Sequence, residues 1–151
     1  MILSLGRWQL ECDRGAKVAC YAALPVGIDC TCAECRNFTA AHEHAFPAEF
    51  RAIASQLGVD LTKPAELAPC GREPSGRYVM SGWHHFVGTI QSGADAWTEN
   101  GRGDFERLVE GFEFGFTSLL WPVADPFQRH PVVQLELVTR VPWVLAEPEA
   151  E

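Results

Sequence analysis

Three cysteines stand close together in the segment Cys30-Thr31-Cys32-Ala33-Glu34-Cys35, the densest group of potentially reactive side chains in the chain. Thiolates are soft ligands that hold Zn²⁺ and similar ions, and paired thiols also carry out disulfide exchange. A helix beginning near Cys32 would place these sulfurs beside unpaired backbone N–H groups, which stabilise negative charge. The segment is therefore the first candidate for a functional site.

A closed zinc site needs four ligands, so Cys30, Cys32 and Cys35 require a fourth donor from elsewhere in the chain. Cys70 is our candidate for that ligand, with one of the two cysteines nearer the N-terminus as an alternative. His42 shares a predicted helical face with Cys35, but seven residues of helix rise about 10.5 Å, too far for both to bind one ion. The sequence contains no second C-x-x-C motif to strengthen the case. The predicted metal set is Cys30, Cys32, Cys35 and Cys70, with zinc as the cofactor it would take.

Two other interpretations of the same cysteines stay open. In a thiol redox protein, Cys32 would be the nucleophile and Cys35 the resolving thiol, although Glu34 between them would raise nearby thiol pKa values. In the plainer alternative the cysteines are small side chains packed in the core, because free cysteine is among the most buried residue types. Packing predicts buried, separated sulfurs, and redox chemistry predicts an exposed Cys32.

The elements that must position the cysteines begin with a predicted β-hairpin. Its strands are residues 8–12 and 17–23, and Asp13-Arg14-Gly15 forms the turn, with glycine supplying a positive φ. A helix is predicted from Cys32 or Ala33 to about residue 45. A second helix follows over residues 46–57, where the apolar residues recur at helical spacing and Gly58 is placed to end it.

The rest of the chain is predicted to be mostly strand. Residues 59–76, which contain Cys70, read as loop because prolines and glycines interrupt them. Strands are predicted over residues 78–91, within 108–117 and from residue 133 onward. We therefore predict an α+β fold, a mostly antiparallel sheet of about five strands with two helices inserted after the N-terminal hairpin. Residues 1–146 form the single domain and residues 147–151 an acidic tail.

Composition and charge narrow the class of protein. The chain has 151 residues, of which 47% are hydrophobic, so it can bury a substantial core. Its 12 basic and 20 acidic residues give a net charge of −8, which disfavours nucleic acid and anionic membrane surfaces as partners. The N-terminus carries no secretory signal pattern, and no apolar run is long enough to span a bilayer. We expect a cytoplasmic protein with reduced thiols.

Several segments resemble a bacterial protein family of unknown function. The residues that carry the resemblance are Asp29-Cys30-Thr31-Cys32-Ala33-Glu34-Cys35-Arg36-Asn37-Phe38, a C-x-C-x-x-C-R-N-F segment, and the later Trp83-His84-His85-Phe86-Val87-Gly88, a W-H-H-F-V-G segment. The resemblance covers roughly residues 20–145 and implies a small bacterial cytosolic protein. It carries over no catalytic residues.

No catalytic motif of the hydrolase-elbow or phosphate-loop kind is present in the sequence. His84 and His85 are adjacent on a predicted strand, so they point to opposite faces and cannot share one metal ion. Phe112, Phe114 and Phe116 alternate with other residues and are expected to form a wall of the core or an apolar binding face. The leading interpretation is a non-catalytic binding or interaction module, whose partner is an unidentified ligand, a protein or a second copy of the chain. Zinc binding and thiol redox chemistry are the alternatives.

Overall fold

The computed structural model describes residues 1–25, 30–120 and 123–149, and its described part combines four α-helices with one seven-stranded sheet. All strand pairs are antiparallel. The predicted α+β class is therefore confirmed, whereas about five strands was an underestimate. Residues 26–29 of the expected loop before the cysteines, and residues 150–151 of the predicted tail, lie outside the described residues.

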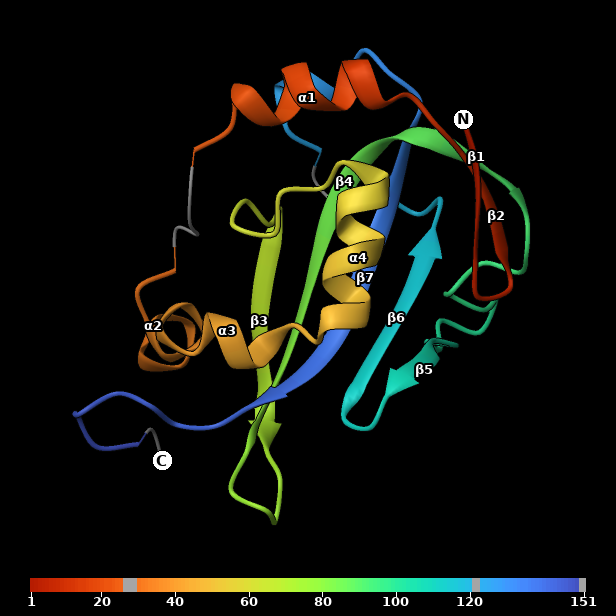
Figure 1. Cartoon of the computed structure of the whole chain (residues 1–151). Coiled ribbons are helices and arrows are strands. Elements are labelled where there is room, and N and C mark those ends of the chain that lie inside the picture. Colours follow the sequence, from red (N-terminus) through yellow and green to blue (C-terminus); the bar gives the residue numbers. More distant parts are fainter. Residues whose placement is uncertain (26–29, 121–122, 150–151) are drawn as a thin grey trace.

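The strands follow the order β1-β2-β4-β7-β6-β5, and β3 also pairs with β4, outside this order (Figure 1). Their bounds are β1 Ile2–Leu5, β2 Trp8–Cys12, β3 Glu66–Arg72, β4 Tyr78–Ser92, β5 Glu106–Val109, β6 Phe112–Thr117 and β7 Val132–Val141. The long central strand β4 pairs with β7 along one edge from Tyr78 to Val87. Along its other edge it pairs first with β3, as far as Trp83, and later with β2, from Gly88.

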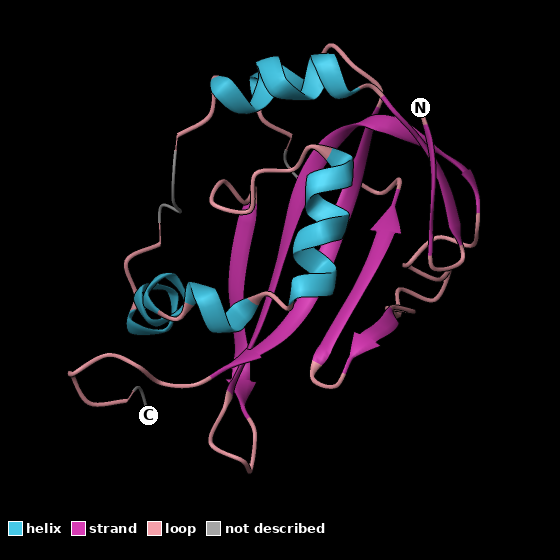
Figure 2. Cartoon of the chain, viewed as in Figure 1, coloured by secondary structure: helices cyan, strands magenta, loops and turns pink. Residues whose placement is uncertain are grey.

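The helices are α1 Arg14–Ala22, α2 Ala33–Ala40, α3 His42–Ala45 and α4 Ala48–Leu57, with a 3₁₀ turn η1 at Asp125–Phe127. Helix α4 lies across one face of the sheet (Figure 2), where the Phe50 ring packs on Phe112 of β6 at 4.6 Å between centroids. The opposite face is covered in part by residues 94–105, and a Cβ added at Gly115 would lie 2.6 Å from the Ala96 Cβ. The core therefore forms two layers around the β4–β7–β6 strands.

The predicted N-terminal hairpin is wrong in its second half. Strand β2 pairs with β1 rather than with residues 17–23, and those residues belong to helix α1. Asp13 caps this helix, because its side chain accepts a hydrogen bond from the Ala16 backbone N–H at 3.0 Å. Gly15 has no positive φ and sits inside the helix rather than in a turn.

The helix predicted from residue 32 or 33 to 45 is divided into α2 and α3. Ala41 separates them with ψ 14°, outside helical backbone. The break turns the chain so that the Phe38 and Phe46 rings meet edge to face at 5.8 Å. The second predicted helix is confirmed as α4, and Gly58 ends it at φ 71°.

The segment predicted as loop at 59–76 contains strand β3. Pro69 and a register shift between Pro69 and Gly71 interrupt the strand, which is why its sequence resembles a loop. Such an irregular strand is tolerated here because β3 lies at an edge of the sheet. The other strands missed from sequence are the four-residue edge strands β1 and β5.

Candidate metal centre

The three clustered cysteines lie at the start of helix α2. Cys32 is the N-cap residue and Cys35 is in the first turn, as the sequence predicts. Arg36 ties the preceding loop to the helix, because its Nε donates to the Thr31 carbonyl at 3.0 Å. The same guanidinium forms an ion pair with Glu147, so the loop is also linked to the C-terminal segment.

The three sulfurs converge. The Sγ atoms of Cys30, Cys32 and Cys35 all lie within 4.8 Å of one another. The Cys30 and Cys32 sulfurs are 3.2 Å apart. Cys35 is fully buried, Cys32 is half-buried and Cys30 is exposed, so the group sits between the core and the surface. A regular tetrahedron of thiolates around zinc has about 3.8 Å between sulfurs, given Zn–S bonds of about 2.3 Å. The spacing is close to what one ion requires.

The surroundings shift the pKa values of the Cys30 and Cys35 thiols in opposite directions. The pKa of Cys30 is lowered, because the Cys32 backbone N–H and the Cys32 and Cys35 thiols all hydrogen-bond its sulfur. The pKa of Cys35 is raised, chiefly by burial and then by its thiol neighbours. The sequence-based redox hypothesis placed the reactive thiol at Cys32, whereas the structure favours negative charge at Cys30.

The other three cysteines lie apart from this group. The Cys70 thiol is exposed on β3, where its Sγ is 3.2 Å from the Ser81 Oγ. Cys12 is buried on β2, and the Cys20 thiol donates to the Pro126 carbonyl at 3.0 Å. All six cysteines are free thiols. Among the described residues, the structure brings together three members of the predicted metal set but not Cys70.

The histidines weighed as possible metal ligands lie away from the three cysteine sulfurs. His84 and His85 are both buried on β4. The His84 Nε2 lies 3.4 Å from the Leu61 carbonyl, and the His85 Nε2 lies 2.9 Å from the Gln134 Oε1. His42 packs against the Phe46 ring at 4.9 Å between centroids. No histidine joins the three sulfurs within the described ranges.

A pocket of about 290 Å³ borders the cluster at Cys30. Its wall is shared by distant parts of the chain: Tyr21, Leu24, Pro25, Cys30, Lys63, Pro64, Ala65, Glu66, His85, Ala124 and Phe127. The sequence does not predict this pocket, because Tyr21 falls in the predicted strand 17–23 and residues 59–76 are predicted to be loop. No local pattern links these positions.

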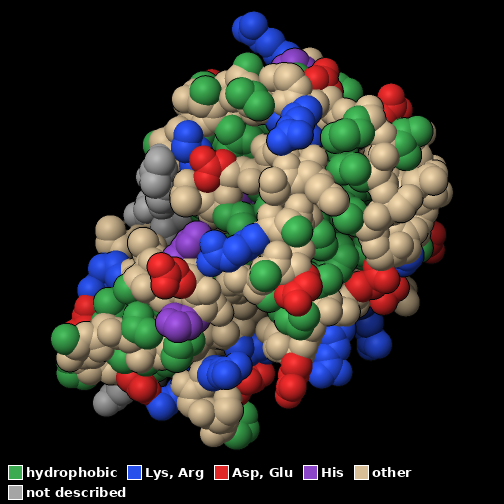
Figure 3. Space-filling model, in the orientation of Figure 1, with side chains coloured by type: hydrophobic (Ala, Val, Ile, Leu, Met, Phe, Trp, Pro, Cys, Tyr) green, Lys and Arg blue, Asp and Glu red, His purple; other side chains and the backbone are tan. Residues whose placement is uncertain are grey.

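The charged side chains of the surface carry both signs. On the face shown in Figure 3, acidic and basic side chains are interspersed rather than gathered into single-sign areas. None of the helices in the described part of the chain has the length and apolar character needed to cross a membrane. Cytoplasmic location and the absence of a nucleic-acid partner remain predictions.

The fold and site define a protein of the α+β class with a three-cysteine group able to hold a metal ion. Comparison with protein-family models, with curated proteins and with solved structures found no match to this chain. The resemblance to a bacterial family, drawn from short segments, therefore stays a prediction. Function has to be argued from the site itself.

Proposed function

We propose that this protein binds a thiophilic divalent metal ion, with zinc as the best candidate, through Cys30, Cys32 and Cys35. The convergence of the three sulfurs carries the proposal. Thiolate ligands select zinc and other soft ions over magnesium or calcium, which prefer oxygen. The loop before α2 and the first helical turn supply all three ligands, so the site depends on one short segment.

The charge of such a site is partly offset by its surroundings. Three thiolates around a divalent ion leave one net negative charge. The helix α2 N-terminus directs backbone N–H groups toward this charge. The Arg36 guanidinium interacts electrostatically with Cys32. Both features favour a thiolate-rich centre.

The competing interpretations explain less of the geometry. Core packing accounts for Cys35, but Cys30 is exposed and gains nothing from burial. Disulfide exchange between Cys32 and Cys35 would leave Cys30 without a role, although its sulfur lies in the same group. Metal binding is the interpretation that uses all three sulfurs.

The proposal is tested by metal content and by titration of the reduced, metal-free protein with Co²⁺, whose thiolate charge-transfer absorption reports sulfur ligation. We expect about one metal ion per chain after purification without chelator. Cys30→Ser and Cys32→Ser should each weaken metal binding at least tenfold. Cys30 is the better test position, because an exposed side chain can be changed without disturbing the core.

Cys70→Ser is the matched control, since it removes an exposed thiol outside the cluster. We expect this variant to retain the wild-type metal content, and its loss of metal would instead assign the fourth ligand to Cys70. Wild-type protein that shows neither bound metal nor cobalt–thiolate absorption would contradict the proposal. In that case added zinc would not change the rate at which the clustered thiols react with a thiol reagent.

A further inference from the structure

We infer that the pocket beside Cys30 binds a small carboxylic acid carrying a thiol, whose sulfur takes the fourth position on the metal. The inference rests on the metal site proposed above and names the ligand that this site would receive. Three observations support it: the place of the pocket in the sheet, the chemistry of its walls and its size.

The pocket occupies a gap at one edge of β4. Strand β3 pairs with β4 only as far as Trp83, and β2 begins to pair at Gly88, so no strand in the described part of the chain pairs with residues 84–87 on that edge. Helix α1 and its N-cap residue supply two hydrogen bonds to this edge. The Tyr21 hydroxyl donates to the His85 carbonyl at 2.5 Å, and the Asp13 N–H donates to the Val87 carbonyl at 3.1 Å. The His85 and Val87 carbonyls therefore have hydrogen-bond donors that come from outside the sheet.

The walls of the pocket combine a soft donor with a cation. Cys30 contributes one member of the sulfur cluster, so a metal held there lies at the pocket boundary. The Lys63 ammonium donates one hydrogen bond to the Tyr21 carbonyl at 2.7 Å. A lysine ammonium has three N–H groups, so two remain for a ligand carboxylate.

The remaining wall combines apolar side chains with the Glu66 carboxylate and the His85 ring. Leu24, Ala124 and Phe127 supply apolar surface for a short carbon chain. Glu66 also borders the pocket, but its Oε1 accepts a hydrogen bond from the Leu67 N–H at 3.1 Å and its side chain is exposed. The His85 Nε2 is paired with Gln134. Lys63 is therefore the group best placed to select an anion.

The size of the pocket limits the ligand. A volume of about 290 Å³ is at the lower end of the range for small-molecule sites, so the pocket suits a small ligand. A soft metal ion with three cysteine ligands favours a thiolate as its fourth. A short chain bearing a thiol and a carboxylate matches the two kinds of group in the pocket wall, a soft metal site at Cys30 and a cation at Lys63.

The test uses the cobalt-loaded protein and 3-mercaptopropionate as the probe. The ligand-field bands of cobalt change when a fourth sulfur binds, so affinity can be read from a titration. We expect 3-mercaptopropionate to bind at least tenfold more tightly than 2-mercaptoethanol, which lacks the carboxylate. Propionate, which lacks the thiol, should leave the bands unchanged.

Two variants separate the pocket from the metal site. Lys63→Gln should weaken 3-mercaptopropionate binding at least fivefold and leave cobalt affinity unchanged. Ala65→Phe, at an exposed position on the pocket wall, should block the probe in the same way. Arg77→Gln removes a positive charge outside the pocket wall and should behave as wild type.

The failures are distinguishable. Cobalt that does not bind to thiolates overturns the proposed function and this inference together. Cobalt that binds with normal thiolate absorption but shows equal affinity for both thiols, or no effect of Lys63→Gln, overturns only the inference.

Discussion

At the scale of single residues, the two adjacent histidines of β4 show how burial controls charge. His84 and His85 point to opposite faces of the sheet, as their sequence positions require, and both are about 2% exposed. Burial lowers the pKa of His84 to about 4 and also lowers the pKa of His85. The charged groups that act on His84 are His85, Asp60 and His42, and none outweighs the loss of solvent.

This residue predicts a pH dependence of stability. In the unfolded chain His84 binds a proton near its ordinary pKa of 6.5, whereas in the folded chain it stays neutral down to about 4. The free energy of unfolding should therefore be highest above pH 6.5 and should fall as the pH decreases toward 4. The loss due to His84 is at most about 3.5 kcal/mol, since one pKa unit corresponds to about 1.4 kcal/mol. Urea unfolding at pH 7.5, 6.0 and 4.5 measures it.

His84→Gln is the control, because glutamine cannot be protonated in this range. Its free energy of unfolding should depend less on pH between 6.5 and 4 than that of the wild type. The remaining slope includes His85, the carboxylates with lowered pKa values (Asp60, Asp95 and Glu147) and, with opposite sign, Glu136, whose pKa burial raises. An identical slope in variant and wild type would show that His84 is not held neutral in the folded protein.

At the scale of elements, helix α1 is the clearest departure from the local sequence pattern. Asp13-Arg14-Gly15 is typical of a turn, yet Asp13 caps a helix that continues to Ala22. Two features of the helix favour this outcome. Cys20 and Tyr21 are both buried, and the Tyr21 hydroxyl donates to the His85 carbonyl at the edge of β4.

Gly15→Ala tests this assignment directly. A Cβ at this position would meet nothing closer than the Asp13 Oδ1 at 3.7 Å, and the backbone has no positive φ. Alanine should raise the free energy of unfolding by about 0.5–1 kcal/mol, because it is the better helix former. Thermal or urea unfolding checks the change. A turn with positive φ at Gly15 would make the same substitution destabilising.

Asp13→Ala should have the opposite effect on the same helix. It removes the side-chain acceptor for the Ala16 N–H and should lower the free energy of unfolding by about 1 kcal/mol. Asp13→Asn keeps an acceptor at the cap and should recover most of the loss. Equal stability of Asp13→Ala and wild type would show that the cap does not contribute.

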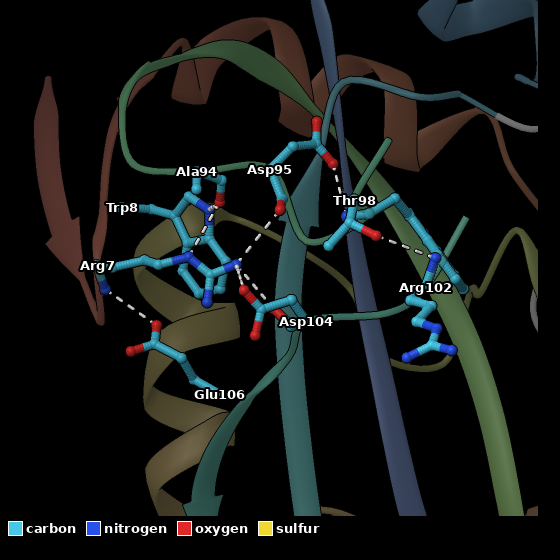
Figure 4. A network of polar contacts seen from close by, with 9 residues as sticks. Arg7, Trp8, Ala94, Asp95, Thr98, Arg102, Asp104 and Glu106 are labelled. Carbon is cyan, nitrogen blue, oxygen red and sulfur yellow. Dashed lines mark hydrogen bonds and ion pairs between the residues drawn. The ribbon is translucent and has the colours of Figure 1, made fainter. Parts of the chain in front are cut away.

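At the scale of the whole molecule, the sheet curls so that its two ends approach each other. Trp8 of β2 packs on Phe114 and Phe116 of β6, with ring centroids 5.7 and 5.3 Å apart, although β4 and β7 lie between these strands in the sheet. Arg7 completes the contact (Figure 4). Its guanidinium lies over the Trp8 ring at 4.1 Å and donates to the carbonyls of Ala94, Asp95 and Asp104.

Arg7→Ala should therefore destabilise the whole fold, by about 1–3 kcal/mol in urea unfolding, since three carbonyls lose a charged donor and Trp8 loses its cation. Arg7→Lys should recover little, because an ammonium cannot reproduce the forked geometry of the guanidinium. Arg77→Ala removes an exposed arginine from the turn between β3 and β4 and is expected to change stability by less than about 0.5 kcal/mol. Similar losses for Arg7→Ala and Arg77→Ala would contradict this account.

The sequence by itself determined the features that depend on local periodicity and spacing. The elements β4, β6, β7 and α4 were predicted close to their observed bounds. Alternation marks β6 and β7, helical spacing marks α4, and bulky groups on both faces mark β4 as a central strand. The proximity of Cys30, Cys32 and Cys35 also followed from sequence, since a segment of six residues at a helix start cannot separate three sulfurs widely.

Only the tertiary structure decided the features that depend on distant partners. The hydrogen bond from Tyr21 to the β4 edge, the irregular edge strand β3 beside Gly82, and the pocket that joins Cys30 to Lys63 all arise between segments far apart in the chain. Cys70 has the same residue type as the clustered cysteines, but β3 directs its thiol toward Ser81. Such contacts leave no local pattern, because their free energy comes from surfaces that meet only when the sheet has formed.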